Sequence, residues 1–133
     1  MTTKISTAFL IVVFSLFMGC NLLAQSTDQV QTKAKVEVYY FHLNSRCVTC
    51  KTVESEAQKD VKELFGNDVS FTSYNLEEAT GEAKGKELGV NSQTLLVVKG
   101  DKKINLTNEG FMYARTNPKK FKKVIEDKIK PLL

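Results

Sequence analysis

Two cysteines separated by two residues are the part of this sequence best suited to chemistry. Cys47 and Cys50 enclose Val48 and Thr49, and this spacing places both sulfurs on one helical turn, close enough to form a disulfide with little backbone movement. So short a loop removes little chain entropy, which makes stabilisation a poor reason for such a disulfide. The pair therefore predicts thiol–disulfide exchange.

The cysteine pair lies where a predicted strand passes into a predicted helix. Unpaired backbone N–H groups and the helix macrodipole stabilise negative charge at a helix N-terminus, so we expect Cys47 to lose its proton more readily than a free thiol, whose pKa is ~8.5. Arg46 adds a positive charge beside it, and His42 is either a simple loop residue or a second group that tunes Cys47. We expect Cys47 to be the nucleophile and Cys50, one turn deeper, the resolving thiol.

Metal binding is the main alternative use of the cysteine pair. A zinc site normally needs four ligands, and His42 is the obvious neutral third ligand once a leader is removed. We predict no metal and no cofactor beyond the disulfide within the chain. A metal or metalloid binding module that uses Cys47 and Cys50 stays open as an alternative, and so does a redox-inert interaction protein on the same scaffold.

Hydrophobic patterns predict the elements that position the pair. β-branched, aromatic or continuous apolar segments indicate strands, and apolar residues three and four apart indicate helices. Asn75 and Glu78 predict a cap for the second helix, which Gly81 and Gly85 weaken. The predicted strands are residues 36–41, 69–74, 94–98 and 103–107, and the predicted helices are residues 47–65, 76–88 and a last helix that begins near Pro118.

This β-α-β-α-β-β-α order predicts an α/β fold with a mixed four-stranded sheet and helices on both faces. Together with the cysteine pair, the order resembles thioredoxin over about residues 35–131. The strings Tyr39-Tyr40-Phe41-His42, Arg46-Cys47-Val48-Thr49-Cys50 and Gly110-Phe111-Met112-Tyr113-Ala114-Arg115 are further similar to a small exported bacterial group, the ArsF-like thioredoxin family. The resemblance implies a three-layer thioredoxin-like fold with a redox-active dithiol. A nitroreductase link in the name of that group does not follow from these residues.

The resemblance also implies a substrate groove beside the cysteines. Thioredoxin has a cis-proline before its third strand that helps to hold the substrate backbone, whereas the aligned residues here are Gln93 and Thr94. Phe111 and Met112, in a predicted loop, either line a hydrophobic groove for a partner or fold onto the core.

Two further departures from thioredoxin concern the surroundings of the cysteines. Thioredoxin has a tryptophan before its first cysteine and a buried aspartate behind its second. This chain has no tryptophan, and it offers Arg46 in the first place and Tyr40 or Phe41 in the second. The departures predict a dedicated protein thiol or disulfide partner rather than a broad range of substrates.

The first residues are predicted to be a targeting segment rather than part of the folded domain. Lys4, the apolar run over residues 5–18 and the small residues up to Ala24 follow the pattern of a secretory signal peptide, and the run is short for a permanent anchor. Cleavage after Ala24 is favoured over a lipoprotein leader with lipidation at Cys20, and an uncleaved anchor comes third. The chain is thus divided into a leader over residues 1–24, a flexible tether over 25–34 and a domain over 35–133.

The charge balance does not suggest a nucleic-acid partner. The formal net charge is +4, and removal of the leader leaves +3. The lysines between residues 119 and 123 alternate with Phe121 on a predicted helix, which indicates a solvated face rather than a binding patch. We expect a monomeric, exported thiol–disulfide oxidoreductase or electron carrier, periplasmic or anchored facing the periplasm, that meets a membrane only through its leader or a lipid at Cys20.

Overall fold

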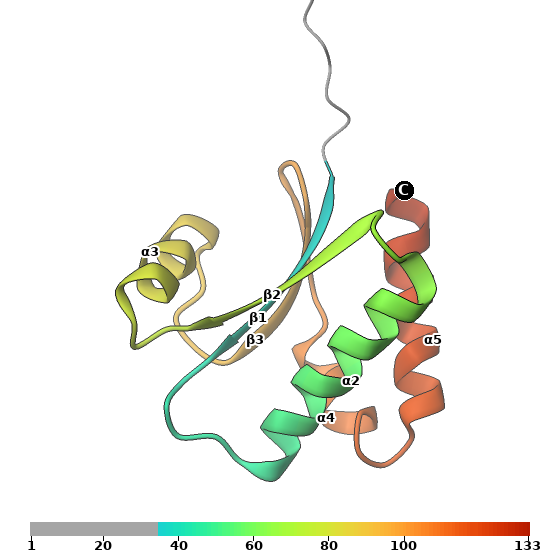
Figure 1. The fold of residues 1–133 in the computed structure, drawn as a ribbon, viewed down its shortest axis with the longest axis horizontal. Helices are drawn as coiled ribbons and strands as arrows, with labels where there is room; N and C mark the ends of the chain where they lie inside the picture. Colours follow the sequence, from blue (N-terminus) through green and yellow to red (C-terminus); the bar gives the residue numbers. More distant parts are fainter. Residues whose placement is uncertain (1–34) are drawn as a thin grey trace, which may run out of the picture. The chain divides into compact units, whose positions relative to one another are not determined.

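The computed structural model describes residues 35–133. The predicted signal peptide, the alternative lipidation at Cys20 and the predicted tether lie outside the described residues. Figure 1 shows the elements in chain order, which are β1 (Val36–His42), α2 (Val48–Phe65), β2 (Val69–Asn75), α3 (Ala79–Leu88), β3 (Thr94–Lys99), β4 (Lys102–Asn105), α4 (Thr107–Tyr113), α5 (Pro118–Ile129) and the 3₁₀ turn η1 (Lys130–Leu132).

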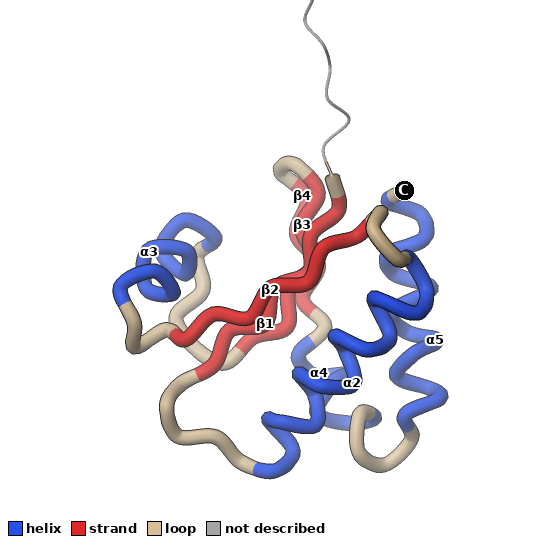
Figure 2. The backbone as a smooth tube through the Cα atoms, viewed as in Figure 1, coloured by secondary structure: helices blue, strands red, loops and turns tan. Residues whose placement is uncertain are grey.

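The four strands form one mixed sheet in the order β2-β1-β3-β4 (Figure 2). β1 pairs in parallel with β2, because a helix joins the two strands, and it pairs antiparallel with β3. A tight turn with Gly100 at a φ of 55° leads from β3 into its antiparallel partner β4. The predicted α/β fold with a mixed four-stranded sheet is confirmed, and the arrangement is thioredoxin-like.

Helices cover both faces of the sheet, with α2, α4 and α5 on one side and α3 on the other (Figure 1). Successive side chains of a strand point to opposite faces, so each face has its own hydrophobic core. Tyr40 belongs to the larger core, with Val53 of α2 and Phe121 of α5. Phe41 belongs to the smaller core, with Tyr39. Neighbouring residues of β1 therefore serve different layers.

The second helix begins later than predicted. α3 starts at Ala79, because Asn75 ends β2 and its side chain accepts the backbone N–H of Glu77 at 3.1 Å, which makes a turn rather than a helix cap. Gly81 and Gly85 are buried, and a Cβ atom on Gly81 would lie 1.8 Å from the carbonyl oxygen of Asn75. The glycines let α3 approach the end of β2 closely.

A short helix, α4, stands where a strand end and a loop were predicted. It forms because Leu106, Gly110 and Ala114 recur four residues apart and bury one face of the turn. Gly110 packs directly on α2, since a Cβ atom there would lie 2.8 Å from Cγ1 of Val53. α4 is thereby held against the helix that carries the cysteines.

The last helix follows its prediction. Asn117 caps α5 by accepting the backbone N–H of Lys120 at 3.1 Å, and Pro118 occupies the first turn. Phe121 and Ile125 are buried, while Lys123 faces solvent and pairs with Asp127 on the same helix. Within residues 35–133, no helix combines the length and the apolar character that a membrane crossing requires.

Candidate functional site

Cys47 and Cys50 form a disulfide at the N-terminus of α2, with their Cα atoms 5.0 Å apart. Cys47 is the N-cap residue, and its Sγ atom accepts the backbone N–H of Cys50 at 3.0 Å. Cys47 is exposed, whereas Cys50 is only 6% exposed. An accessible sulfur at a helix start beside a buried one suits thiol–disulfide redox chemistry. Which sulfur attacks and which resolves stays a prediction.

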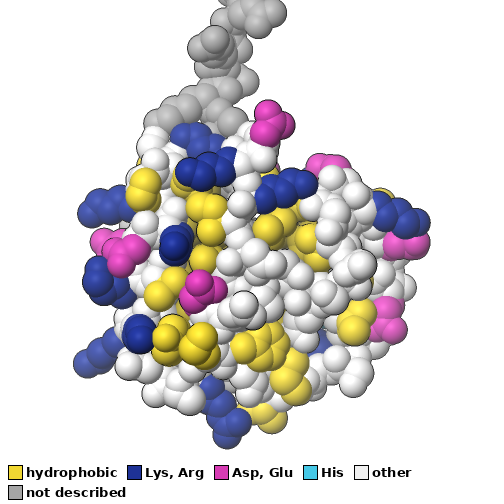
Figure 3. Space-filling view, turned by 180° about the vertical axis from the view of Figure 1, so that it is seen from behind, with side chains coloured by type: hydrophobic (Ala, Val, Ile, Leu, Met, Phe, Trp, Pro, Cys, Tyr) yellow, Lys and Arg dark blue, Asp and Glu magenta, His cyan; other side chains and the backbone are white. Residues whose placement is uncertain are grey.

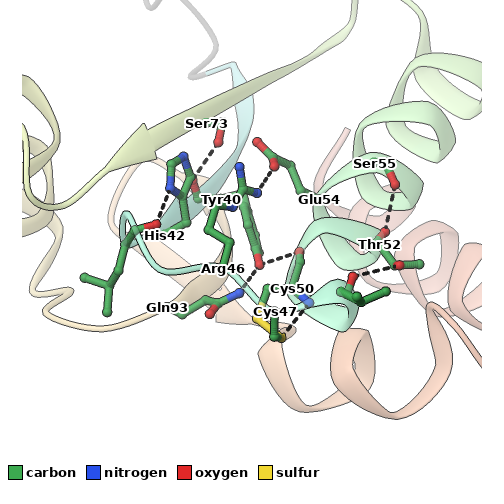
Figure 4. A network of polar contacts seen from close by, with 12 residues as sticks. Tyr40, His42, Arg46, Cys47, Cys50, Thr52, Glu54, Ser55, Ser73 and Gln93 are labelled. Atoms are coloured by element: carbon green, nitrogen blue, oxygen red, sulfur yellow. Dashed lines mark hydrogen bonds and ion pairs between the residues drawn. A yellow bond between two sulfur atoms is a disulfide. The ribbon is translucent and has the colours of Figure 1, made fainter.

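Tyr40 lies directly behind Cys50 (Figure 4). Its fully buried side chain donates a hydrogen bond from the hydroxyl to the carbonyl oxygen of Cys50 at 2.8 Å and accepts one from Nε2 of Gln93. Burial raises the pKa of Tyr40, although Gln93 and Arg46 act in the opposite direction. The sequence left Tyr40 and Phe41 open as occupants of this place, and the structure puts Tyr40 there with a phenol that stays protonated at neutral pH.

Arg46 is turned toward Glu54 of α2, with which it forms an ion pair (Figure 4). Both side chains are 21% exposed, and the guanidinium carbon lies 5.9 Å from the centre of the Tyr40 ring. Burial alone would raise the pKa of Glu54, but hydrogen bonds from Arg46 and Ser73 and the charge of Arg46 outweigh it and hold that pKa below its usual range. Glu54 is therefore ionised and offsets much of the Arg46 charge. Tuning of Cys47 by Arg46 stays a prediction.

His42 lies on the same face of β1 as Tyr40, and the centres of the two rings are 6.3 Å apart. It is partly buried, and its Nδ1 atom lies 3.1 Å from the carbonyl oxygen of Leu43. In the part of the chain that the structure describes, no group of three or more His, Cys, Asp and Glu side chains could hold a metal ion. The metal-binding alternative and the tuning of Cys47 by His42 both stay predictions.

The two predicted groove residues at the start of β3 differ in what they offer a partner. Gln93 is partly exposed and lies beside the disulfide, with its side chain held by Tyr40 (Figure 4). Thr94 is 7% exposed, and its hydroxyl donates to the carbonyl oxygen of Ser92 at 2.9 Å. Thr94 therefore presents little surface, and Gln93 is the residue of the two that a partner can reach.

Large apolar side chains are exposed at the start of α2 and on α4. Val48 in the first turn of α2 is 68% exposed, and Phe111 and Met112 of α4 are 38% and 55% exposed. The latter two lie on a helix, which corrects the predicted loop. Seen from behind, the surface carries several apolar side chains in its lower half (Figure 3). We call Val48, Phe111 and Met112 the apolar rim.

Comparisons with known proteins add distant likenesses only. No protein-family model matches the chain, and no curated protein matches it, so membership of the ArsF-like family stays a prediction. Among solved structures, the crystal structure of Chlamydomonas reinhardtii thioredoxin f2 is similar at 20% identity and a TM-score of 0.43, over 62% of this chain and 77% of that one. A structure described as that of a malarial protein is similar at 21% identity and a TM-score of 0.42, over 52% of this chain and 74% of that one. The strand order β2-β1-β3-β4 and the helices on both faces of the sheet are the features of this chain that are thioredoxin-like.

Proposed function

We propose that this protein is an exported thiol–disulfide oxidoreductase or electron carrier that acts on a dedicated protein partner through Cys47 and Cys50. The observation that carries the proposal is the disulfide at the N-terminus of α2, which joins an exposed cysteine to a buried one. Helix N–H groups favour an anion at the accessible position, and the second sulfur is already within bonding distance. The leader predicted over residues 1–24 supports export.

The exchange balances as two successive displacements. The Cys47 thiolate attacks one sulfur of a partner disulfide, a mixed disulfide forms, and the other partner sulfur leaves with the bonding electron pair and takes up a proton. The Cys50 thiol then gives its proton to solvent and attacks the Cys47 sulfur, which releases the second partner thiolate. Two electrons have passed from the protein to the partner. The reverse sequence oxidises a partner dithiol.

The apolar rim supports a protein partner rather than a small thiol. Val48, Phe111 and Met112 are each more than a third exposed, and large exposed apolar side chains around a reactive group are typical of interaction sites. A glutamine or threonine where thioredoxin has a proline favours a dedicated partner. The apolar rim and the replacement of the proline would favour a protein partner whether the protein reduces or oxidises it.

Trapping of the mixed disulfide tests the proposal. Every variant carries Cys20→Ser, because Cys20 is the third cysteine of the chain and would otherwise react as well. Reduced Cys50→Ser protein mixed with a short cystine-bridged peptide should accumulate a covalent adduct on Cys47, visible by mass spectrometry, and Cys47→Ser should form no adduct. Intact dithiol protein should pass through the adduct and end as the internal disulfide.

Two results would contradict the proposal. One is the absence of an adduct on Cys50→Ser, and the other is a Cys47 thiol that reacts with iodoacetamide no faster than free cysteine at pH 7. Either would leave the redox-inert interaction protein, for which Cys47→Ser changes nothing.

A further inference from the structure

A chain of two hydrogen bonds runs from the buried cysteine to the surface beside it. The Tyr40 hydroxyl contacts the carbonyl oxygen of Cys50 at 2.8 Å, and the Gln93 carboxamide contacts the same hydroxyl from the other side. Tyr40 is fully buried, while Gln93 is partly exposed. The Gln93 side chain therefore bridges the interior and the solvent next to the disulfide (Figure 4).

The direction of these bonds fixes the orientation of the Gln93 amide. A carbonyl oxygen only accepts, so the single phenolic proton of Tyr40 is committed to Cys50. The atom of Gln93 that faces the phenol must then donate, which makes it Nε2 and turns Oε1 outward. Within residues 35–133 the buried side-chain polar atoms without a partner are Arg46 Nε and Asp60 Oδ2. Oε1 of Gln93 is not one of them and has no hydrogen-bond partner in the described part of the chain, so it reaches solvent.

We propose that Gln93 Oε1 is a docking acceptor that takes a backbone N–H of an extended partner segment next to the partner's reactive cysteine. The inference rests on the function proposed above and specifies its substrate class, a polypeptide with a free N–H beside its sulfur. A small disulfide that lacks such a group gains nothing from Gln93.

Preorganisation makes this acceptor effective. A free glutamine side chain loses rotamer freedom when a partner binds, whereas the Gln93 carboxamide is already held by Tyr40 before any partner arrives. Tyr40 acts through Gln93 and Cys50 and is a positioning residue. Its fully buried phenol stays protonated near neutral pH, because burial raises the pKa of Tyr40.

The test compares two disulfides on variants in the Cys20→Ser background. The first probe is a short cystine-bridged peptide, and the second is 5,5′-dithiobis(2-nitrobenzoic acid), which has no amide N–H. Gln93→Leu should lower the second-order rate of reduced protein with the peptide about tenfold, the loss of one well-placed hydrogen bond, and leave the rate with the aromatic disulfide within about twofold. Tyr40→Phe should lower the peptide rate by a smaller factor, since it frees the amide without removing it.

N-methylation of the peptide supplies the decisive cycle. Peptides methylated at either amide next to the cysteine are compared with the parent, and one of the two should react about tenfold more slowly with the unsubstituted Gln93 protein. The same methylation should have no effect on Gln93→Leu, because the acceptor is already gone. Ser92→Ala, an exposed neighbour in the same loop, is the matched control and should behave like the parent.

The outcomes separate this inference from the proposed function. If reduced protein reacts with neither probe faster than free cysteine does, the proposed function itself fails. If it reacts with both, but Gln93→Leu slows both equally or slows neither, or methylation still slows Gln93→Leu, the docking role of Gln93 is refuted and the proposed function stands.

Discussion

Glu54 neutralises much of the charge that Arg46 carries beside the first cysteine. Its carboxylate pairs with Arg46, and both side chains are largely buried. Because the pKa of Glu54 is held below its usual range, the pair stabilises the fold above the unfolded carboxyl pKa of ~4.3. That contribution is lost as the pH falls through the lower folded pKa. At neutral pH the pair is fully formed, so we expect any effect of the guanidinium on Cys47 to be that of a paired charge rather than of a free cation.

We predict that Glu54→Gln makes the Cys47 thiol more acidic. Removal of the carboxylate leaves the Arg46 charge uncompensated close to the start of α2, and a nearby cation favours the thiolate. The midpoint of the iodoacetamide alkylation rate against pH, measured on reduced protein with Cys20→Ser, should fall. Glu63→Gln, at the exposed far end of the same helix, is the control and should leave the midpoint in place. A midpoint that rises or stays constant in Glu54→Gln would remove Arg46 from the tuning groups.

The positions of site residues could be predicted where they follow from local sequence rules, but not where they depend on how one element packs against another. Cys47 is exposed because it precedes the first turn of α2, and Cys50 is buried because it belongs to the apolar stripe of that helix. The choice between Tyr40 and Phe41 depends on which face of β1 meets α2, and the sequence of the strand is apolar on both faces. Glu54 was not singled out, although it lies one turn beyond Cys50 and could have been found as a carboxylate next to the apolar stripe of α2.

At the scale of elements, α3 depends on glycine where it meets β2. Gly81 has no room for a side chain, because a Cβ atom would lie 1.8 Å from the Asn75 carbonyl oxygen, which is a backbone atom and cannot rotate away. Helix propensity alone would favour alanine at Gly81 by ~1 kcal/mol, so packing and propensity oppose each other.

Gly81→Ala should therefore destabilise the protein by ~2–3 kcal/mol despite the better helix former, since α3 has to move away from β2. Urea unfolding followed by far-ultraviolet circular dichroism measures the change. Thr80→Ala, one residue earlier and exposed, should be neutral or slightly stabilising. Equal stability of Gly81→Ala and the parent protein would show that α3 does not pack as closely as described.

Most elements could be predicted because their patterns are long. α2 shows an apolar stripe over five turns, and the central strand β3 is continuously apolar. α4 was missed because it has seven residues and contains Gly110, which by propensity argues against a helix. The spacing of Leu106, Gly110 and Ala114 was the available signal. A glycine is recognised as a packing residue only once the position of α2 against it is known.

At the scale of the whole molecule, Asp60 is an ionisable side chain that α2 buries in the folded protein. It is 2% exposed, and its Oδ2 atom has no hydrogen-bond partner among the described residues. Burial raises the pKa of Asp60 to about 6, with Glu56 and Glu63 acting in the same direction and Lys122 and Lys59 against it. The folded state thus binds a proton that the unfolded chain has already released between pH ~4 and ~6, and the contribution of Asp60 to stability falls as the pH rises through this window.

Asp60→Asn should raise the free energy of unfolding by roughly 2 kcal/mol at pH 7.5, because the amide carries no charge to bury. The advantage over the parent protein should shrink as the pH falls and vanish near pH 4, where Asp60 is protonated in the fold. Urea unfolding at several pH values gives the difference directly. Asp68→Asn, at an exposed site beyond the end of α2, should show no such pH-dependent gain, and a constant advantage of Asp60→Asn at all pH values would point to packing rather than to charge.

The overall layer arrangement could be predicted from the order of elements, since parallel strands joined through helices leave few topologies. Which helices share a face, and therefore which core lies behind the disulfide, required the structure. The packing of α4 against α2 and α5 could not be predicted from any local sequence pattern.

The outer edge of the sheet has a consequence for association with other molecules of the same kind. β4 is four residues long and carries the exposed Lys102 and Lys103, and among residues 35–133 it pairs with β3 alone. A strand from another molecule added along this edge would bring its own charges against these ammonium groups and would find few backbone partners. Short edge strands that carry lysine disfavour the addition of further strands, so we expect intermolecular sheet growth to be disfavoured along β4.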